Sequence, residues 1–575
     1  MKKKQIILLI VCLTLIGLTI TTNYLTINQA KERVIKEQEI KDNEKETSTT
    51  NIIIEEMPIE GEEGVVAGAS TEEESNQYNT KELAIIISST IILTLTILYM
   101  ITTKLCRYSI NTQINSTKRL IYYCSFLVIV CSIIPASLVI ATDKKILNSY
   151  DTKSIADKSM AIIEIDQDKK VSNLREVSDE ENKSVIQVSN MATYEADNIE
   201  LNKNNGQSTD YESSELYGLN AAFIAKEGSS IILSNSKLNS VVAYSAAFFA
   251  TGNGTNASLN NVELTTTKDN SNGLNASDSA EISAQNLTIT TKGQSSSTIK
   301  TLDTNSLISI TDSSLKAEGQ NSSLMYSKGK IEATDITGET NSTIAIIEDR
   351  NSLALTTSTL KTNGSFDNPK EEYNAAFLIY SQESQNSSST YSSAKLDIVD
   401  SVIEITKDSP WYEKTPIFYL TNTEANINIT NTELNYGSNI LLKAVSSTEY
   451  GDVGDNGADV TFTATDQELT GDIIVDSNSK VRLNLNNSTY EGQINADNLS
   501  ANVDVTFDYD SRWNLTGDSY INTLQITKTD YLRRNVRKYI RSNGYNVYYN
   551  SANNEWLEGR TYNLVGGGKL IPLES

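Results

Sequence analysis

The sequence predicts an all-β fold, a parallel β-helix, preceded by three transmembrane α-helices. From about Val188 onward, apolar residues alternate with Ser, Thr, Asn and Asp, and such period-2 alternation is typical of strands that bury one face. A short motif also recurs along the same part of the chain, which indicates a repeat architecture. The helices are predicted by three apolar runs in the first 142 residues.

The apolar runs are Ile6–Ile20, Leu83–Thr103 and Leu120–Ala141. The last two reach the roughly 20 residues that a helix needs to cross a bilayer. The first run follows Lys2, Lys3 and Lys4, so a cleaved signal peptide is an alternative interpretation. No small-x-small cleavage site follows it closely, and the two later runs favour an uncleaved anchor.

The distribution of charge predicts the orientation of these segments. Segment 31–82 contains 15 acidic and 6 basic residues, whereas the loop between the second and third runs has basic residues and no acidic ones. Basic loops remain on the cytoplasmic side. We therefore expect a multi-pass protein of the cell membrane, with the acidic segment as a disordered external loop and the C-terminal domain outside the cell.

The repeated motif is Asn/Asp-x-x-Leu/Ile at the end of a short alternating strand. Its last apolar residues lie 26, 25, 26, 21 and 24 positions apart between Leu238 and Leu360. A period in the low twenties, with strands and no helix, matches one coil of a parallel β-helix. One coil cannot bury its apolar side chains alone, so we expect coils to stack at about 4.8 Å per step. A β-sandwich array and a disordered Ser/Thr-rich stalk are the alternatives. The motif begins at Asn235, Asn261, Asn286, Asp312, Asp400, Asn431, Asp466 and Asn487, and more weakly at Thr334 and Ser358.

These patterns divide the chain into six segments. We expect a first transmembrane helix (1–30), an acidic loop (31–82), a transmembrane hairpin (83–142), a linker or N-terminal cap (143–187), the β-helix (188–527) and a C-terminal cap (528–575).

Composition excludes several classes of function. The 575 residues include 48 basic and 73 acidic side chains, giving a net charge of −25, and no histidine. A His-dependent catalytic triad and a His-ligated metal are therefore excluded. All four cysteines precede residue 143, which excludes a disulfide scaffold in the C-terminal part. Nucleic acid is a poor partner for so acidic a chain.

The C-terminal part resembles a known family in several stretches. The most specific are YGLNAAF (217–223), IAIIEDRNSLALTTSTL (344–360) and TGDSYINTL (516–524). They resemble adhesin-like surface proteins of Gram-positive anaerobes. That resemblance implies a right-handed parallel β-helix of the pectin-lyase-like kind. Some related β-helices bind acidic polysaccharides with calcium, and enzymes of this fold cleave them as lyases. The three apolar runs depart from the family, which has a plain signal peptide.

Three groups of residues are candidates for binding. Trp411, Tyr412, Tyr450 and Trp513 offer rings that stack on sugars, although packing roles are the alternative. Asp452, Asp455 and Asp459 lie in a Gly-rich loop where carboxylates could hold Ca²⁺, although polar-turn chemistry explains them equally. A basic cluster, with spacings that suit one helical face, caps the acidic rod or contacts anionic polymers. It consists of Arg533, Arg534, Arg537, Lys538 and Arg541.

These observations predict a membrane-anchored, adhesin-like surface protein without catalytic activity. Its partners are expected to be the bilayer and the polysaccharides of a host or neighbouring cell surface. Two alternatives remain open, a polysaccharide lyase acting on acidic glycans and an envelope spacer without a specific ligand. The lyase would need Asp or Glu opposite Lys or Arg on one face of adjacent coils.

Overall fold

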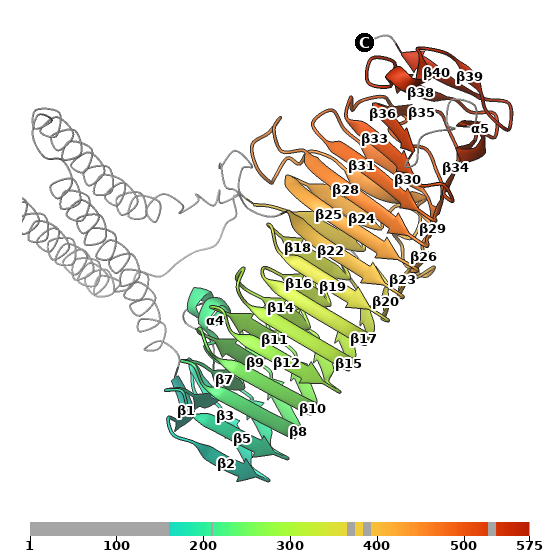
Figure 1. Cartoon of the computed structure of the whole chain (residues 1–575). Coiled ribbons are helices and arrows are strands. Elements are labelled where there is room, and N and C mark those ends of the chain that lie inside the picture. The colour runs from blue at the N-terminus through green and yellow to red at the C-terminus, as the bar shows by residue number, and fades with distance from the viewer. Residues whose placement is uncertain are drawn as a thin grey trace, which may run out of the picture. The chain divides into compact units, whose positions relative to one another are not determined.

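The computed structural model describes residues 160–573, except 207, 209–210, 365–373, 383–392 and 527–535. The chain divides into two compact units, Met1–Asn148 and Ser149–Ser575, and all described residues belong to the second. Within this unit, short strands stack in chain order (Figure 1). Among the described residues every strand pairing is parallel except the last, so the stack is compatible with a parallel β-helix.

Sheet A contains one short strand from each of twelve successive coils. Its strands are β1 (Met160–Ile165), β4 (Lys183–Val188), β7 (Phe223–Ala225), β9 (Ala246–Thr251), β11 (Asn272–Ser277), β14 (Ile299–Thr301), β16 (Met325–Ser327), β18 (Ala345–Glu348), β21 (Phe377–Tyr380), β24 (Phe418–Thr421), β27 (Ile440–Ala444) and β30 (Asp472–Val475).

Sheet B has two arms in most coils, which meet at a corner. Its strands are β2 (Lys169–Ser172), β3 (Arg175–Ser178), β5 (Thr193–Asp197), β6 (Glu200–Lys203), β8 (Ser230–Ser240), β10 (Asn256–Thr266), β12 (Glu281–Gln285), β13 (Thr288–Thr291), β15 (Leu307–Ala317), β17 (Lys330–Thr340), β19 (Ser352–Thr356), β20 (Thr359–Thr362), β22 (Ala394–Val399), β23 (Val402–Ile405), β25 (Thr423–Thr430), β26 (Glu433–Asn435), β28 (Ala458–Thr465), β31 (Lys480–Asn486), β33 (Val503–Phe507) and β36 (Thr523–Ile526).

Two four-stranded sheets complete the C-terminal coils. Sheet C contains β29 (Glu468–Thr470), β32 (Thr489–Glu491), β34 (Arg512–Asn514) and β37 (Ile540–Arg541). Sheet D contains β35 (Ser519–Ile521), β38 (Val547–Asn550), β39 (Tyr562–Asn563) and β40 (Lys569–Leu573). The antiparallel pair β39–β40 ends the parallel stack.

The prediction of three transmembrane helices and of a multi-pass location is corrected by the structure. In the described part of the chain, no helix is long and apolar enough to cross a membrane. The helices there are α4 (Tyr211–Tyr217), α5 (Val536–Tyr539) and the 3₁₀ turn η3 (Glu555–Leu557). The three apolar runs and the acidic segment lie outside the described residues.

The core runs the length of the stack as ladders of apolar side chains from successive coils. In sheet A, Phe223 pairs with Phe248 and their rings stack with centroids 5.1 Å apart. Farther along, Phe377 and Phe418 repeat the arrangement at 5.5 Å. Strand β15 of sheet B shows the alternation that predicted it, since every second side chain is buried on each side of the corner residue Asp312. The coils therefore share one continuous hydrophobic core.

The repeated Asn/Asp motif marks the corner of sheet B. The corner residue has a φ between 44° and 58° in twelve successive coils. Asn and Asp tolerate this left-handed conformation better than other non-glycine residues. The corner amides also bond along the stack, as where Asn261 Nδ2 donates to Asn235 Oδ1 at 2.7 Å. The corner residues are Asn173, Asn198, Asn235, Asn261, Asn286, Asp312, Asp335, Thr357, Asp400, Asn431, Asp466 and Asn487.

A ladder of buried polar side chains follows the corner. The backbone N–H of Ser358 donates to Ser401 Oγ at 3.0 Å, and that of Ser401 donates to Thr432 Oγ1 at 3.3 Å. The same contact recurs where the backbone N–H of Gln467 donates to Ser488 Oγ at 3.0 Å. A buried N–H without a partner is destabilising, so these side chains satisfy the backbone where the two arms meet.

The stack begins earlier than the sequence boundary at 188 suggests. Strand β1 pairs with β4 through five residue pairs between Met160 and Val188. The first corner residue, Asn173, lies between β2 and β3. The repeat is hard to recognise here because β2 and β3 are rich in Lys, Arg and Glu and have few buried positions.

Replacing Asn261 with Ala tests the corner. We expect a loss of about 1–2 kcal/mol of unfolding free energy, because Ala must adopt a left-handed conformation and the amide contact is lost. Asn261→Gly should lose less, since Gly accepts positive φ. The matched control is Asn260→Ala, an exposed position one residue earlier. Denaturant midpoints that rank Asn261→Ala no lower than Asn260→Ala would contradict this explanation.

Lys203 is a buried basic residue in the second coil, and it predicts a pH dependence of stability. Its side chain is fully buried, with Nζ against the Glu180 carbonyl and 3.5 Å from Ser178 Oγ. Burial lowers the pKa of Lys203 from 10.5 to about 8. Between these values the unfolded chain binds the additional proton, so the unfolding free energy of the wild type rises with pH.

Lys203→Met removes this dependence. The stability of the variant relative to the wild type should therefore fall by about 3 kcal/mol between pH 8 and pH 10.5. Denaturation across that range measures the difference. Parallel pH profiles for the two proteins would refute it.

Candidate functional site

The outer face of sheet A is largely covered. Every residue of β9 and β11 is buried, on both faces of the sheet. Helix α4 lies over this region, where Ser277 Oγ donates to the Leu216 carbonyl at 3.3 Å. A small apolar cluster lies on the outer side, separate from the main core. It consists of Ala221, Ile224, Ala246 and Phe249.

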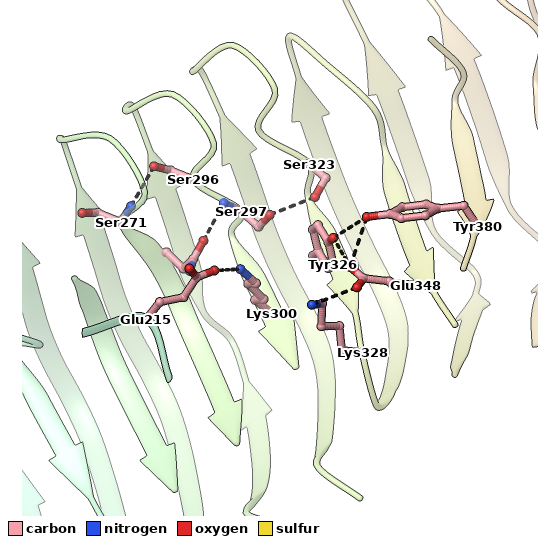
Figure 2. Close-up of polar contacts among 11 residues, drawn as sticks. Glu215, Ser271, Ser296, Ser297, Lys300, Ser323, Tyr326, Lys328, Glu348 and Tyr380 are labelled. Atoms are coloured by element: carbon pink, nitrogen blue, oxygen red, sulfur yellow. Dashed lines mark hydrogen bonds and ion pairs between the residues drawn. The ribbon is translucent and has the colours of Figure 1, made fainter. Parts of the chain in front are cut away.

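Charged and aromatic side chains from neighbouring coils lie together on this face (Figure 2), and Glu215 of α4 is one of them. We call them the sheet A cluster. Lys300 Nζ lies 2.6 Å from Glu215 Oε1, and Lys328 Nζ lies 2.9 Å from Glu348 Oε1. The cluster consists of Glu215, Lys300, Tyr326, Lys328, Glu348 and Tyr380.

Glu348 is the centre of the cluster. Its carboxylate is only 3% exposed and accepts hydrogen bonds from the hydroxyls of Tyr326 and, at 3.1 Å, Tyr380. The two hydroxyls lie 2.8 Å apart. Lys300 Nζ lies 5.1 Å from the ring centroid of Tyr326, a cation–π contact. The buried carboxylate is therefore fully hydrogen-bonded and paired with a cation.

The electrostatics of the cluster do not favour acid–base chemistry. Lys300 lowers the pKa of Glu215 below its ordinary value. Burial raises the pKa of both Tyr326 and Tyr380 well above that of a free tyrosine, so both hydroxyls remain protonated at neutral pH. Each lysine already has a carboxylate partner. The arrangement supplies hydrogen bonds and cohesion rather than a free base or a free cation.

The four predicted aromatic residues are not brought together. Trp513 is fully buried, stacks on Tyr490 at 6.1 Å and donates its indole N–H to the Gly492 carbonyl. It belongs to the core, as in the packing role that is the alternative to sugar binding. The Tyr450 ring lies against that of Tyr380 in the sheet A cluster, with centroids 4.3 Å apart and the planes tilted by 33°.

Trp411 and Tyr412 lie in the turn between β23 and β24, at the opposite end of the sheet A strands from the turn that holds Tyr450. Lys414 Nζ lies 4.9 Å from the Trp411 ring, and both Trp411 and Tyr412 are half-buried. Tyr412 packs against the core. These two rings therefore cannot form one platform with Tyr450.

The predicted calcium ligands are also separated. Asp459 lies in β28 and pairs with Arg482 and, at 3.7 Å, with Lys480. Asp452 and Asp455 lie in the preceding turn, where the Asp455 N–H donates to the Asp452 carbonyl at 3.0 Å. In the part of the chain that the structure describes, no group of three or more acidic side chains is arranged to hold a metal ion.

The basic cluster is described only in part. Arg533 and Arg534 lie outside the described residues. Helix α5 ends at Tyr539, and Arg541 lies in β37, so a single helical face through Arg541 is not formed. Lys538 packs over the Tyr509 ring at 3.2 Å. The role of the basic cluster, as a cap of the acidic rod or as a contact for anionic polymers, stays a prediction.

The outer face of sheet B presents rows of polar side chains in register. One row, which we call the threonine row, lies beside the corner residues. Thr311 pairs with Thr334, which pairs with Thr356, and Thr430 pairs with Thr465. Val399 connects the two parts. The threonine row consists of Thr311, Thr334, Thr356, Thr430 and Thr465, all half-exposed.

Sequence reasoning missed the sheet A cluster. Lys300, Lys328 and Tyr326 look scattered when the chain is aligned on the corner motif. Aligning the buried residues of sheet A instead places Lys300 opposite Tyr326 and Glu348 opposite Tyr380. The signal existed in the sequence, but the short strands of sheet A lack an Asn/Asp marker.

The fold and its two faces define an all-β repeat protein of stacked parallel sheets. Comparisons of the chain with protein-family models, with curated proteins and with solved structures found no match. The resemblance to pectin-lyase-like adhesins therefore stays a prediction.

Glu348→Gln tests the cohesion of the sheet A cluster. We expect a loss of about 2 kcal/mol of unfolding free energy, because Lys328 and two buried hydroxyls lose their charged acceptor. The control is Glu332→Gln, which breaks the 2.5 Å pair with Lys330 on the exposed face of sheet B. An exposed pair contributes less than about 1 kcal/mol. Equal shifts in the denaturation midpoints of the two variants would contradict a stabilising role of Glu348 beyond that of an exposed ion pair.

Proposed function

We propose that the chain is a non-catalytic, adhesin-like binding protein whose stacked sheets hold extended glycans. The observation that carries the proposal is the in-register rows on the outer face of sheet B. Hydroxyl and amide side chains recur there from coil to coil, at about 4.8 Å per step. A glycan chain presents hydroxyls at regular intervals and can exchange hydrogen bonds with many coils at once.

Repetition compensates for weak individual contacts. A single exposed threonine contributes little to affinity, because it exchanges a bond to water for a bond to the ligand. Contacts on several coils of one rigid stack act together and raise the overall affinity by multivalency. The net charge of −25 favours neutral glycans over acidic ones.

A polysaccharide lyase is the second candidate. It is favoured by the convergence of two lysines, two glutamates and two tyrosines in the sheet A cluster. Against it, each lysine is paired with a glutamate, and burial raises the pKa of both tyrosines. A lyase needs a cation for the substrate carboxylate and a base for its proton. Binding therefore explains the outer faces better than catalysis.

Retention of the full chain on an array of neutral and acidic glycans, with and without calcium, tests the proposal. We expect retention on neutral polysaccharides, reduced about fivefold or more in Thr334→Lys/Thr356→Lys, because two bulky charges interrupt the threonine row. The control Asn253→Lys/Thr304→Lys adds the same charge at exposed turn positions and should bind like the wild type.

Ultraviolet absorbance of the array supernatant reports unsaturated uronide products at the same time. Formation of that product would refute the non-catalytic proposal and favour the polysaccharide lyase. Loss of retention in both double variants, or a blank array, would refute the role of the threonine row and favour a spacer.

A further inference from the structure

A shallow, open depression lies near the C-terminal end of the stack. It is lined by Ala552, Asn553, Glu555 and Trp556, at the start of η3. Its lining thus includes one aromatic, one amide and one acidic residue. None of these residues stands out in the sequence, since Trp556 follows a short Asn-rich turn rather than a repeat motif.

The depression is held rigidly by the residue beneath it. Asn554 is 1% exposed and accepts the Leu524 N–H at 2.8 Å. Its own amide donates to the carbonyls of Asn522 and Asn550, both at 2.7 Å. One buried side chain therefore joins the turn to two other segments, residues 522–524 and the end of β38. The turn that presents Asn553 and Glu555 is preorganised.

Trp556 has a defined orientation. Its indole N–H donates to the Leu524 carbonyl at 3.0 Å, and part of the ring packs against the core. The remaining surface lines the depression. A ring fixed in this way can stack on an apolar sugar face without losing further rotational freedom.

Of the polar groups beside the ring, the Asn553 amide is held in one orientation and the Glu555 carboxylate is available to a ligand. Asn553 Nδ2 donates to Asn522 Oδ1 at 2.6 Å, which fixes the plane of its amide and turns its carbonyl away from that bond. Glu555 is exposed, and no ion-pair partner is found for it among the described residues. A carboxylate and an amide carbonyl both accept hydrogen bonds from hydroxyl groups.

We propose that this depression binds one pyranose unit of a neutral saccharide. The ring of Trp556 would stack on the sugar face, while Glu555 and Asn553 accept hydrogen bonds from its hydroxyls. The unpaired carboxylate repels uronic acids, which excludes acidic sugars from the site. The site is separate from the threonine row and binds a short ligand, so it extends the proposed function rather than depending on it.

Isothermal calorimetry of the full chain with cellotetraose, with the N-acetylglucosamine tetramer and with tetragalacturonate tests the site. We expect saturable binding of a neutral tetramer and none of tetragalacturonate. Asn553→Ala/Glu555→Ala, which changes only exposed side chains, should weaken binding about tenfold. Trp556→Leu should weaken it at least as much. The control Glu433→Ala/Asn435→Ala removes the same residue types from β26 and should leave the affinity unchanged.

Fluorescence of the Trp411→Phe variant locates the contact, because Trp513 is buried and Trp556 lines the depression. Saturable change of this emission by the same neutral tetramer supports the site. No binding of either neutral tetramer, or unchanged affinity in Asn553→Ala/Glu555→Ala, would overturn it. Thr334→Lys/Thr356→Lys should bind the tetramer normally, which separates this result from the test of the threonine row.

Discussion

Successive coils must stay in register where the two arms of sheet B meet, and the rest of the structure depends on that corner. The chain changes direction there by taking up a left-handed conformation at one residue, which most side chains resist. Asn and Asp accept it, and the next residue often supplies a hydroxyl to the neighbouring backbone N–H. A slip of one residue would move every apolar side chain to the solvent side. The corner therefore determines which residues form the core and which form the rows.

The two outer faces follow from this register but differ in character. On sheet B the outward side chains stand in open rows of threonine, asparagine and charged residues, with ion pairs between adjacent coils such as Lys237 and Glu263. On sheet A the outward face is covered in part by α4, and the charges of the sheet A cluster are paired, with Glu348 buried among them. One face can thus meet a long ligand, whereas the other mainly holds the coils and α4 together.

The buried cluster and the shallow depression illustrate two uses of polar residues. Around Glu348 every charge has a partner, so the network stabilises the stack and offers little to a substrate. At η3 the buried Asn554 fixes the turn. Asn553 and Trp556 each bond a residue of the segment 522–524, and Glu555 faces solvent. A binding site requires groups that are held in place but can still form hydrogen bonds with a ligand.

The amino-acid sequence alone determined the all-β fold and the repeat, because alternation and the left-handed corner are local requirements that each coil must meet by itself. The Asn/Asp residues from Asn235 to Asn487 were predicted as repeat markers, and they are the corner residues. Only the tertiary structure decided what lies together across coils. Lys300 meets Glu215 from 85 residues away, Trp513 turns into the core, and Trp556 lines a depression beside Asn553. Such contacts depend on the offset between coils of unequal length, and no local pattern records that offset.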